Sequence, residues 1–188
     1  MEALSKAIES SDWYTRGNAV KMLAEFQDES VLECLLERVT DRSEYVRSNV
    51  VEALGRSKDP RVVESLIRLL KDPYWYVRGK AAEALGEVGN ERGIAPLIEA
   101  LDSGEDWSLF VRRNAASALV KIGRPALKAL EKALEDRNSD VRSAVAWILG
   151  EIGEKESLEL LRRKIADADS RVSFYVAEAL EKIDQENT

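Results

Sequence analysis

The sequence predicts an all-α protein built as a stack of six helical hairpins, which is an α-solenoid. Three observations indicate this architecture: a short phrase that recurs down the chain, a helical spacing of apolar residues after each copy, and a second apolar pattern before it. A hairpin of about thirty residues cannot bury its own apolar face, so successive hairpins must stack on one another. The composition agrees, because 45% of the residues are hydrophobic and the 34% that are charged are mixed in sign.

The recurring phrase is Asp-x-x-x-x-Val-Arg. Its four full copies begin at Asp41, Asp72, Asp106 and Asp136. Two incomplete copies flank them, with Ser10 in the aspartate position of the first copy and Ser173 in the arginine position of the last. The six copies fill the 188 residues and predict one continuous domain, with repeats at about 1–26, 29–56, 59–88, 91–122, 124–152 and 155–183.

The residues that follow each phrase have the pattern of a helix with a broad buried face. Counted from Val77, apolar residues occupy positions +4, +7, +8 and +11, which lie on one side of an α-helix. Positions +4, +5 and +7 are mostly Ala or Val, which lets neighbouring helices approach closely. Leucine holds position +8 in all six copies: Leu23, Leu54, Leu85, Leu119, Leu149 and Leu180. This helix is the second helix of each hairpin.

The segments between these helices carry a second amphipathic pattern, as in Val62, Val63, Leu66 and Leu70, and predict the first helix of each hairpin. Twelve helices result. Pro96 lies deep within its segment and predicts either a kinked helix or a late start. Six glycines near the ends of second helices are expected to form left-handed C-caps: Gly55, Gly86, Gly89, Gly123, Gly150 and Gly153.

Two stretches make a resemblance to a known family specific. They are ESLIRLLKDPYWYVRGKAAEALGEVGNERGIAPLIEAL, residues 64–101, and EDRNSDVRSAVAWILGEIG, residues 135–153. Both resemble HEAT repeats of the short type found in phycobilisome lyase subunits, and the similarity extends over residues 1–184. The resemblance implies a right-handed superhelix of antiparallel helix pairs, with the second helices on the concave side and a main role as a protein-binding scaffold.

The aspartates and arginines of the phrase are expected to be structural rather than catalytic. Each Asp falls in the turn before a second helix, where it can cap backbone N–H groups, and Arg suits several converging acceptors. The incomplete end copies indicate that each Arg reaches the Asp of the next repeat, because pairing within a repeat would leave two unpartnered charges. The expected ladder pairs are Arg16 with Asp41, Arg47 with Asp72, Arg78 with Asp106, Arg112 with Asp136, and Arg142 with Asp167.

The positions of the second helices that are not used for packing predict a binding surface. Nine of the twelve aromatic residues fall in these 36 positions, whereas an even spread over 188 residues would put about two there, and exposed Trp and Tyr are typical of binding hot spots. The alternative is that the rings pack over the hairpin ends as part of the core. The candidate protein-binding residues are Trp13, Tyr14, Asn18, Tyr45, Asn49, Trp75, Tyr76, Lys80, Phe110, Arg113, Asn114, Trp147, Phe174 and Tyr175.

The same surface suggests what kind of partner it takes. Its charges of both signs favour a polypeptide over a polyanion. The small residues Gly17, Ser48 and Gly79, beside asparagines, are expected to let a ligand backbone come close and form hydrogen bonds. An extended peptide and a helix of a partner are equally compatible with this surface. The sequence therefore predicts an interaction scaffold that binds an unidentified protein or peptide on the concave face.

Other classes of function fit less well. A formal charge of −7 argues against non-specific nucleic-acid binding, although Arg112, Arg113, Lys121 and Arg124 form a local basic cluster. The chain has no histidine and a single cysteine, Cys34, so it cannot assemble a Cys/His zinc site or the His-Glu diiron centre of HEAT-like hydroxylases. We therefore expect no enzyme activity, metal or cofactor. A chromophore-lyase-like subunit stays the main alternative, although no bilin nucleophile is identifiable.

The expected location is the cytoplasm. No apolar run approaches the roughly 20 residues that span a bilayer, and the start of the chain lacks the pattern of a secretory signal.

Overall fold

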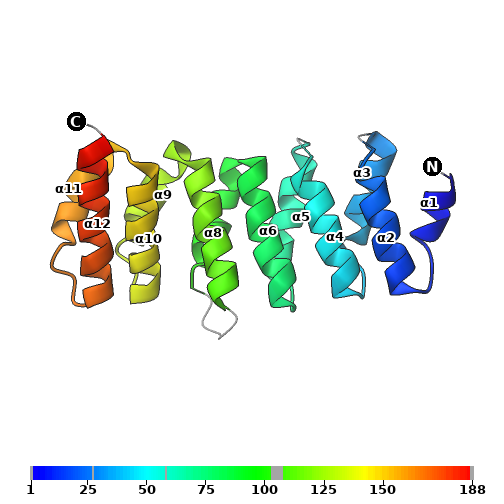
Figure 1. Cartoon of the computed structure of the whole chain (residues 1–188), viewed down its shortest axis with the longest axis horizontal. Coiled ribbons are helices and arrows are strands. Elements are labelled where there is room, and N and C mark those ends of the chain that lie inside the picture. The colour runs from blue at the N-terminus through cyan, green and yellow to red at the C-terminus, as the bar shows by residue number, and fades with distance from the viewer. Residues whose placement is uncertain (1, 27, 58, 103–107, 187–188) are drawn as a thin grey trace.

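The computed structural model describes residues 2–26, 28–57, 59–102 and 108–186. Within these ranges the chain forms twelve α-helices and no strand, with short 3₁₀ turns before or after some of the helices (Figure 1). The helices are α1 (Glu2–Ala7), α2 (Trp13–Leu23), α3 (Glu29–Glu37), α4 (Glu44–Gly55), α5 (Arg61–Leu69), α6 (Trp75–Val88), α7 (Ile94–Glu99), α8 (Ser108–Ile122), α9 (Leu127–Ala133), α10 (Ser139–Ile152), α11 (Leu158–Arg163) and α12 (Ser170–Glu186).

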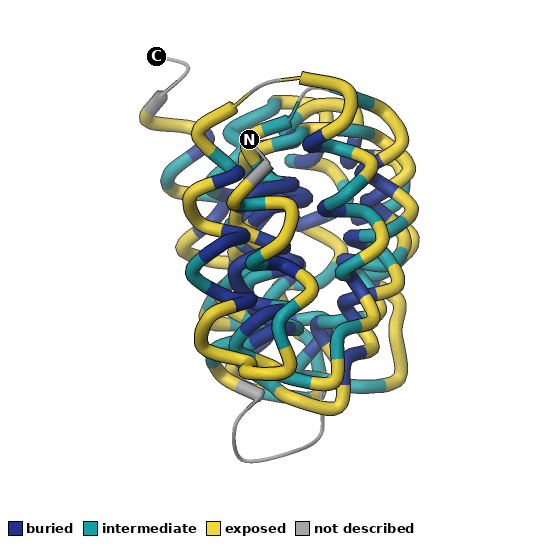
Figure 2. Tube along the Cα trace, turned by 90° about the vertical axis from the view of Figure 1, so that its right-hand side faces the viewer, coloured by how far each residue is buried: buried dark blue, intermediate teal, exposed yellow. Residues whose placement is uncertain are grey.

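The helices form two layers along one axis. The second helices α2, α4, α6, α8, α10 and α12 stand side by side in the layer nearest the viewer in Figure 1, and the first helices lie behind them. Figure 2, which looks along the stack, shows the buried residues gathered between the two layers. The all-α solenoid that the sequence predicts is therefore confirmed.

The core follows the repeat. Leu23, Leu54, Leu85, Leu119 and Leu149 are at most 1% exposed, and full burial of a leucine side chain stabilises a fold by about 1.5–3 kcal/mol. Leu180, on α12, is half-buried and packs against the same core. The leucine column thus runs through the stack as a continuous seam.

The first helices are shorter than the second, and three of them begin with a 3₁₀ turn: Glu91–Gly93, Arg124–Ala126 and Lys155–Ser157. Pro96 is the third residue of α7, where the missing backbone N–H removes no intrahelical bond, so the helix starts late and is not kinked there. No helix among the described residues is long and apolar enough to cross a membrane.

The six glycines near the ends of second helices fall into two groups. Gly89, Gly123 and Gly153 have positive φ, as expected for left-handed C-caps or the turn that follows. For the other three the C-cap prediction is wrong, because they lie within their helices at negative φ and touch an alanine of the next second helix. These contacts are Gly55 with Ala84, Gly86 with Ala118, and Gly150 with Ala179.

These Gly–Ala contacts allow neighbouring second helices to approach closely, since a Cβ on Gly86 would lie 2.7 Å from the Cα of Ala118. The equivalent positions of α8 and α10 carry Val120 and Ile148, which are bulkier. Correspondingly, α8 and α10 are in less extensive contact than any other pair of neighbouring second helices. The second-helix layer therefore has its least extensive contact between the fourth and fifth repeats, where the first helices α7 and α9 are also in contact.

Candidate functional site

Three arginines of the recurring phrase, Arg16, Arg47 and Arg142, each join two repeats. Nη1 of Arg47 donates to the carbonyl oxygen of Asp41, in the turn of its own repeat, at 2.7 Å. Its Nε and Nη2 donate to the two carboxylate oxygens of Asp72, in the next repeat, at 2.6 and 2.9 Å. The same two-pronged pairing joins Arg16 to Asp41 and Arg142 to Asp167. The structure thus contains these three expected inter-repeat pairs.

The aspartates also cap the turn that precedes each second helix. Asp41 Oδ1 accepts a hydrogen bond from the backbone N–H of Ser43 at 2.9 Å, and Asp72 Oδ1 accepts one from that of Tyr74 at 2.8 Å. All the carboxylate oxygens of these two residues are therefore occupied within the fold, which supports a structural role.

The other two expected inter-repeat pairs are not found among the described residues. The pair of Arg112 with Asp136 is wrong: Nη1 of Arg112 lies 3.2 Å from Asp140 Oδ2, and its Nε donates to the Leu101 carbonyl. This exception falls between α8 and α10, the neighbouring second helices with the least extensive contact. The partner expected for Arg78, Asp106, lies outside the described residues. Arg78 Nη1 donates to the Asp72 carbonyl at 2.9 Å.

The last copy of the phrase shows what the serine does in the arginine position. Ser173 Oγ donates to the carbonyl oxygen of Asp167 at 3.2 Å, so it makes the bond within the repeat and leaves out the bond to a following one. At the other end, Arg16 Nη1 donates to the Ser10 carbonyl, which needs no aspartate side chain.

The ladder perturbs the titration of its members. Burial alone would raise the pKa of the Asp41 carboxyl, but hydrogen bonds from Arg16 and Ser43 outweigh it and hold this pKa below its ordinary value. The Arg142 guanidinium similarly lowers the pKa of Asp167, and hydrogen bonding to Asp167 raises the pKa of Arg142. Both carboxylates are therefore fixed in their charged form at neutral pH.

Cys34 is half-buried on α3 and packs against the core, and burial raises the pKa of its thiol. In the described ranges, no three His, Cys, Asp or Glu side chains lie close enough together to hold a metal ion.

The candidate binding residues at the start of the second helices form two clusters of three rings. In the N-terminal aromatic cluster, the Trp13 ring stands edge-on to Tyr14 and Tyr45, with centroids 5.8 and 5.3 Å away. Tyr14 and Tyr45 are stacked at 6.0 Å. Trp13 and Tyr14 are 50% and 56% exposed, whereas Tyr45 is half-buried.

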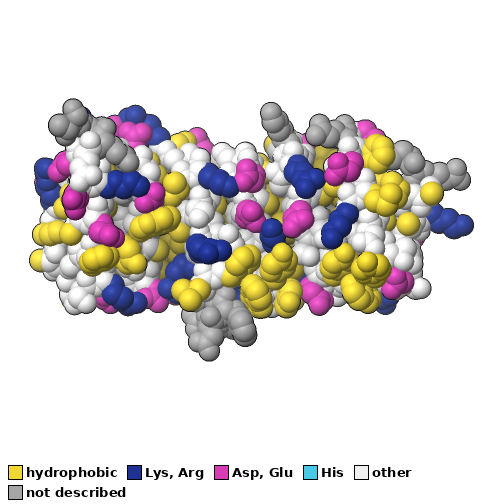
Figure 3. All heavy atoms as spheres, viewed as in Figure 1, with side chains coloured by type: hydrophobic (Ala, Val, Ile, Leu, Met, Phe, Trp, Pro, Cys, Tyr) yellow, Lys and Arg dark blue, Asp and Glu magenta, His cyan; other side chains and the backbone are white. Residues whose placement is uncertain are grey.

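The central aromatic cluster repeats this geometry two repeats later. Trp75 stands edge-on to Tyr76 and Phe110 at 5.7 and 5.3 Å, and Tyr76 stacks with Phe110 at 5.7 Å. All three rings are half-buried. Figure 3 shows hydrophobic side chains gathered in two groups along the lower edge of the second-helix layer, where α2 and α4, and then α6 and α8, begin.

The glycine and asparagine rows have a different role from the one expected. The Tyr45 ring fills the space beside Gly17, and the Phe110 ring fills the space beside Gly79, so neither glycine admits a ligand backbone. Asn49 is only 6% exposed and donates to the Gly17 carbonyl at 3.2 Å. Asn114 is half-buried, and its Nδ2 is buried without a hydrogen-bond partner. The two glycines lie against the rings of the clusters, and Asn49 is bonded within the fold, so these residues do not face a ligand.

The remaining candidates lie elsewhere on the second helices. Trp147 is 37% exposed and, with the half-buried Tyr175, lines a groove of about 330 Å³ between α10 and α12. Phe174 is 57% exposed and stands edge-on to Tyr175. Asn18 is half-buried and accepts a hydrogen bond from the Tyr45 hydroxyl, while Arg113 is exposed. Asn18 thus adjoins the N-terminal cluster, whereas Trp147, Phe174 and Tyr175 lie on α10 and α12, outside both clusters.

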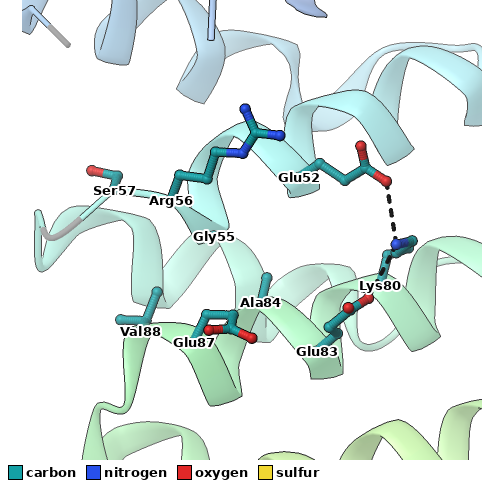
Figure 4. Close-up of a pocket in the computed structure, with 9 residues that line it drawn as sticks. All are labelled: Glu52, Gly55, Arg56, Ser57, Lys80, Glu83, Ala84, Glu87 and Val88. Atoms are coloured by element: carbon teal, nitrogen blue, oxygen red, sulfur yellow. Dashed lines mark hydrogen bonds and ion pairs between the residues drawn. The ribbon is translucent and has the colours of Figure 1, made fainter. Parts of the chain in front are cut away.

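A second groove, of about 720 Å³, lies between α4 and α6, and Gly55 and Ala84 are among the residues that line it (Figure 4). Lys80 Nζ points between two carboxylates, 3.2 Å from Glu52 Oε1 and 3.1 Å from Glu83 Oε2. Partial burial alone would lower the pKa of Lys80, but the hydrogen bonds that it donates to these carboxylates outweigh burial and raise the pKa. The groove is therefore polar, and the charge of Lys80 is compensated by carboxylates that line the same groove.

The local basic cluster is also neutralised. Arg113 is exposed, while the other three members each pair with carboxylates of a neighbouring repeat: Arg112 with Asp140, Lys121 with Glu87, and Arg124 with Glu154 and Glu156. A surface whose cations are already paired offers little to phosphate groups.

Comparison with known proteins decides the family. The family model described as HEAT repeats matches residues 1–82, 63–144 and 127–188, which together span the chain. The chain belongs to the HEAT-repeat family. No curated protein matches its sequence significantly.

Solved structures similar to this HEAT-repeat chain share its fold. The complex of CpcE and CpcF of phycocyanin lyase from Nostoc sp. PCC7120 matches with a TM-score of 0.63 at 22% identity, over 100% of this chain and 88% of that one. An engineered protein matches with a TM-score of 0.56 at 24% identity, over 98% and 96%. A designed armadillo repeat protein in complex with the peptide (KR)4 matches with a TM-score of 0.54 at 18% identity, over 96% and 98%.

Sequence reasoning missed two exposed apolar residues beside the clusters of this HEAT-repeat protein. Tyr74 is 41% exposed with its ring centroid 5.9 Å from that of Trp75, and Leu109 is 72% exposed next to Phe110. Tyr74 is the N-cap of α6, so it lies one position before the helix residues from which the candidate binding residues are predicted. Leu109 lies on α8 itself, but an aliphatic side chain is not part of the aromatic and polar pattern that is typical of binding hot spots.

Proposed function

We propose that this HEAT-repeat chain is a non-catalytic interaction scaffold that binds a polypeptide on the face formed by its second helices. The observation that carries this proposal is the pair of aromatic clusters on one face. In the N-terminal cluster, Trp13 and Tyr14 at the start of α2 leave about half of their side-chain surface exposed to solvent. Exposed Trp and Tyr surrounded by polar residues are enriched in the hot spots of protein interfaces.

The fold is suited to this role. A solenoid presents a long, repetitive surface, and each repeat adds one more contact site along it. The structurally similar designed armadillo repeat protein is a complex with a peptide, and the phycocyanin lyase structure is a complex of two chains. Both are assemblies with a polypeptide, which supports a polypeptide partner here.

Affinity capture tests the proposal. The wild-type chain and the variant Trp13→Ala/Tyr14→Ala/Trp147→Ala are immobilised and exposed to a lysate of the source organism, and captured proteins are quantified by mass spectrometry. We expect at least one protein to be captured by the wild type and lost from the variant, because each truncation at a hot spot weakens binding by about 2 kcal/mol or more.

The matched control is Ile165→Ala, which removes a 47% exposed apolar side chain from the turn after α11. Circular dichroism must show that all three proteins are folded. Capture that is equal for the wild type and the aromatic variant, or equally reduced by Ile165→Ala, would contradict binding through the aromatic face.

A second candidate is a subunit of a lyase composed of two repeat chains. The likeness to the CpcE and CpcF complex over the whole chain motivates it. It predicts that the captured partner is itself a helical-repeat protein, and that the two chains together, but neither alone, attach a bilin to an apo-phycobiliprotein. Absorbance of bilin bound covalently after denaturation would detect the transfer.

A further inference from the structure

The two aromatic clusters are built from the same sequence phrase. Trp-Tyr-x-Arg-Gly occurs at residues 13–17 and again at 75–79, and in both cases the next repeat supplies the third ring. The ring geometry agrees closely, with interplanar angles of 81° and 84° for the edge-on pair and 16° and 11° for the stacked pair. The chain thus presents the same ring arrangement twice, with more of it exposed in the N-terminal cluster than in the central one.

The separation of the two sites follows from the stack. Equivalent rings of the N-terminal and central clusters lie on helices two steps apart, α2 and α6, with α4 between them (Figure 1). Neighbouring packed helices lie about 8–10 Å apart, so the clusters are roughly 16–20 Å apart. A ligand that reaches both must place matching groups at that distance.

The charge next to each cluster indicates what those groups are. Lys21 Nζ lies 5.1 Å from the centroid of the Tyr45 ring, and Lys80 Nζ lies 6.0 Å from that of Tyr76. Because a lysine already occupies the position over a ring in each cluster, that position is not open to a ligand cation. The clusters therefore favour an uncharged ring or apolar group.

The backbone conformation of the ligand can be inferred in the same way. A β-strand ligand gains most of its affinity from a sheet edge, and the described part of this chain is entirely helical and turn. A polyproline II segment instead has fully solvated carbonyls, which can accept hydrogen bonds from side-chain donors. Lys21, Tyr14 and Trp13 supply such donors at the N-terminal cluster.

The spacing fits this conformation. A polyproline II helix has three residues per turn and rises about 3.1 Å per residue, so positions i and i+6 share a face and lie about 19 Å apart. Aromatic-lined grooves are the known binding mode for such segments, and proline is the uncharged ring that stabilises them.

We propose that the two aromatic clusters together bind one proline-rich segment in the polyproline II conformation, with prolines at i and i+6 seated one on each cluster. This inference rests on the proposed function, since it names the chemistry of the polypeptide that the second-helix face binds.

Three synthetic peptides of equal length and composition test it by fluorescence anisotropy. The first carries proline at i, i+3 and i+6, the second carries the same prolines at consecutive positions, and the third carries them at i, i+3 and i+4, so that only one cluster can be occupied. We expect the first to bind at least about tenfold more tightly than the other two, because engagement of the second cluster is intramolecular.

Protein variants locate the binding. We expect Trp13→Ala and Trp75→Ala each to lower the affinity for the first peptide by about tenfold or more and to remove its advantage over the third. Ile165→Ala, at an exposed apolar side chain outside the candidate binding residues, should leave the affinity within about twofold of the wild type. Trp13 is half exposed, so the test stands on this variant if Trp75→Ala proves unfolded by circular dichroism.

Equal affinity for the three peptides, or an equal loss with Ile165→Ala, would overturn the inference. So would tighter binding of the peptide (KR)4 or of an amphipathic helix whose affinity depends on Trp13, and in that case the scaffold function would stand with a different ligand. If the lysate capture also shows no dependence on the aromatic residues, the proposed function fails together with this inference.

Discussion

The Phe110 ring occupies the space that a Cβ atom on Gly79 would need. Tyr45 stands in the same relation to Gly17, so the glycine of one repeat and the ring of the next form an interlocking pair. This pairing explains why the third ring of each cluster is half-buried while the tryptophan of the N-terminal cluster is half exposed.

Gly79→Ala should destabilise the protein by about 1–3 kcal/mol, because the added methyl group overlaps a ring that cannot move without leaving its stack. The double variant Gly79→Ala/Phe110→Ala should lose less stability than the sum of the single variants. Denaturant unfolding measures these free energies. Gly93→Ala is the control, since its Cβ would make an ordinary 3.4 Å contact with Leu85. An additive cycle would contradict the interlocking pair.

Gly150→Ala should also destabilise, but without a simple rescue. A Cβ there would lie 2.8 Å from the Cβ of Ala179 and 2.9 Å from its Cα, so backbone atoms obstruct it. Removing the neighbouring methyl with Ala179→Gly should therefore recover only part of the lost 1–3 kcal/mol, which is the range typical of overpacking at about one methyl group. Full recovery of the unfolding midpoint would show that the helices can separate there at little cost.

The ladder can be tested by removing one charge of a pair. Arg16→Met should cost about 3 kcal/mol of unfolding free energy, because it leaves the Asp41 carboxylate, whose side chain is 7% exposed, without its partner. Arg16→Met/Asp41→Asn should recover part of the loss while keeping the cap on Ser43. The control Arg92→Met breaks a pair exposed by 64% and 61% and should change stability by less than about 1 kcal/mol.

Acid should weaken the ladder. Asp41 and Asp167 have pKa values below the ordinary range when folded, whereas in the unfolded chain they titrate near about 3.9. Below that pH the unfolded state binds more protons, so the free energy of unfolding falls as pH decreases through the folded pKa values. Asp41→Asn and Asp167→Asn should each flatten this decline. Urea titrations between pH 7 and about 2.5 measure it, and an unchanged slope would refute the contribution.

How far the sequence predicts this protein can be seen in individual residues. The leucine at position +8 and the serines of the two end copies follow directly from the repeat, because burial and charge pairing depend on positions that recur. Asp136 is not the partner of Arg112 although both repeats carry the full phrase; the exception falls where α8 and α10 are least in contact, and a single repeat does not encode the extent of that contact. Gly55 resembles a C-cap glycine by position, and only the contact with Ala84 on the next helix reveals its role.

The binding surface was harder to predict for the same reason. Counting along one helix identifies Tyr45 and Phe110 as outward-facing, but whether a ring is free depends on the residue beside it in the preceding repeat. The helical count predicts that Asn49 and Asn114 face a ligand. Asn49 is instead buried beside Tyr45 and Gly17, and Asn114 is half-buried beside Phe110 and Gly79. A glycine followed one repeat later by an aromatic residue is the sequence signal that would have revealed both.

The junction between α8 and α10 bears on how the protein comes apart. In a stack where each repeat contacts only its neighbours, stability is close to a sum over interfaces, and we expect opening where the second helices are least in contact. The first four repeats, which carry both aromatic clusters, are then one cooperative unit, and the last two are another. Amide hydrogen exchange should therefore be faster throughout α9 to α12 than in α4 and α6, with the change in rate falling after Ile122.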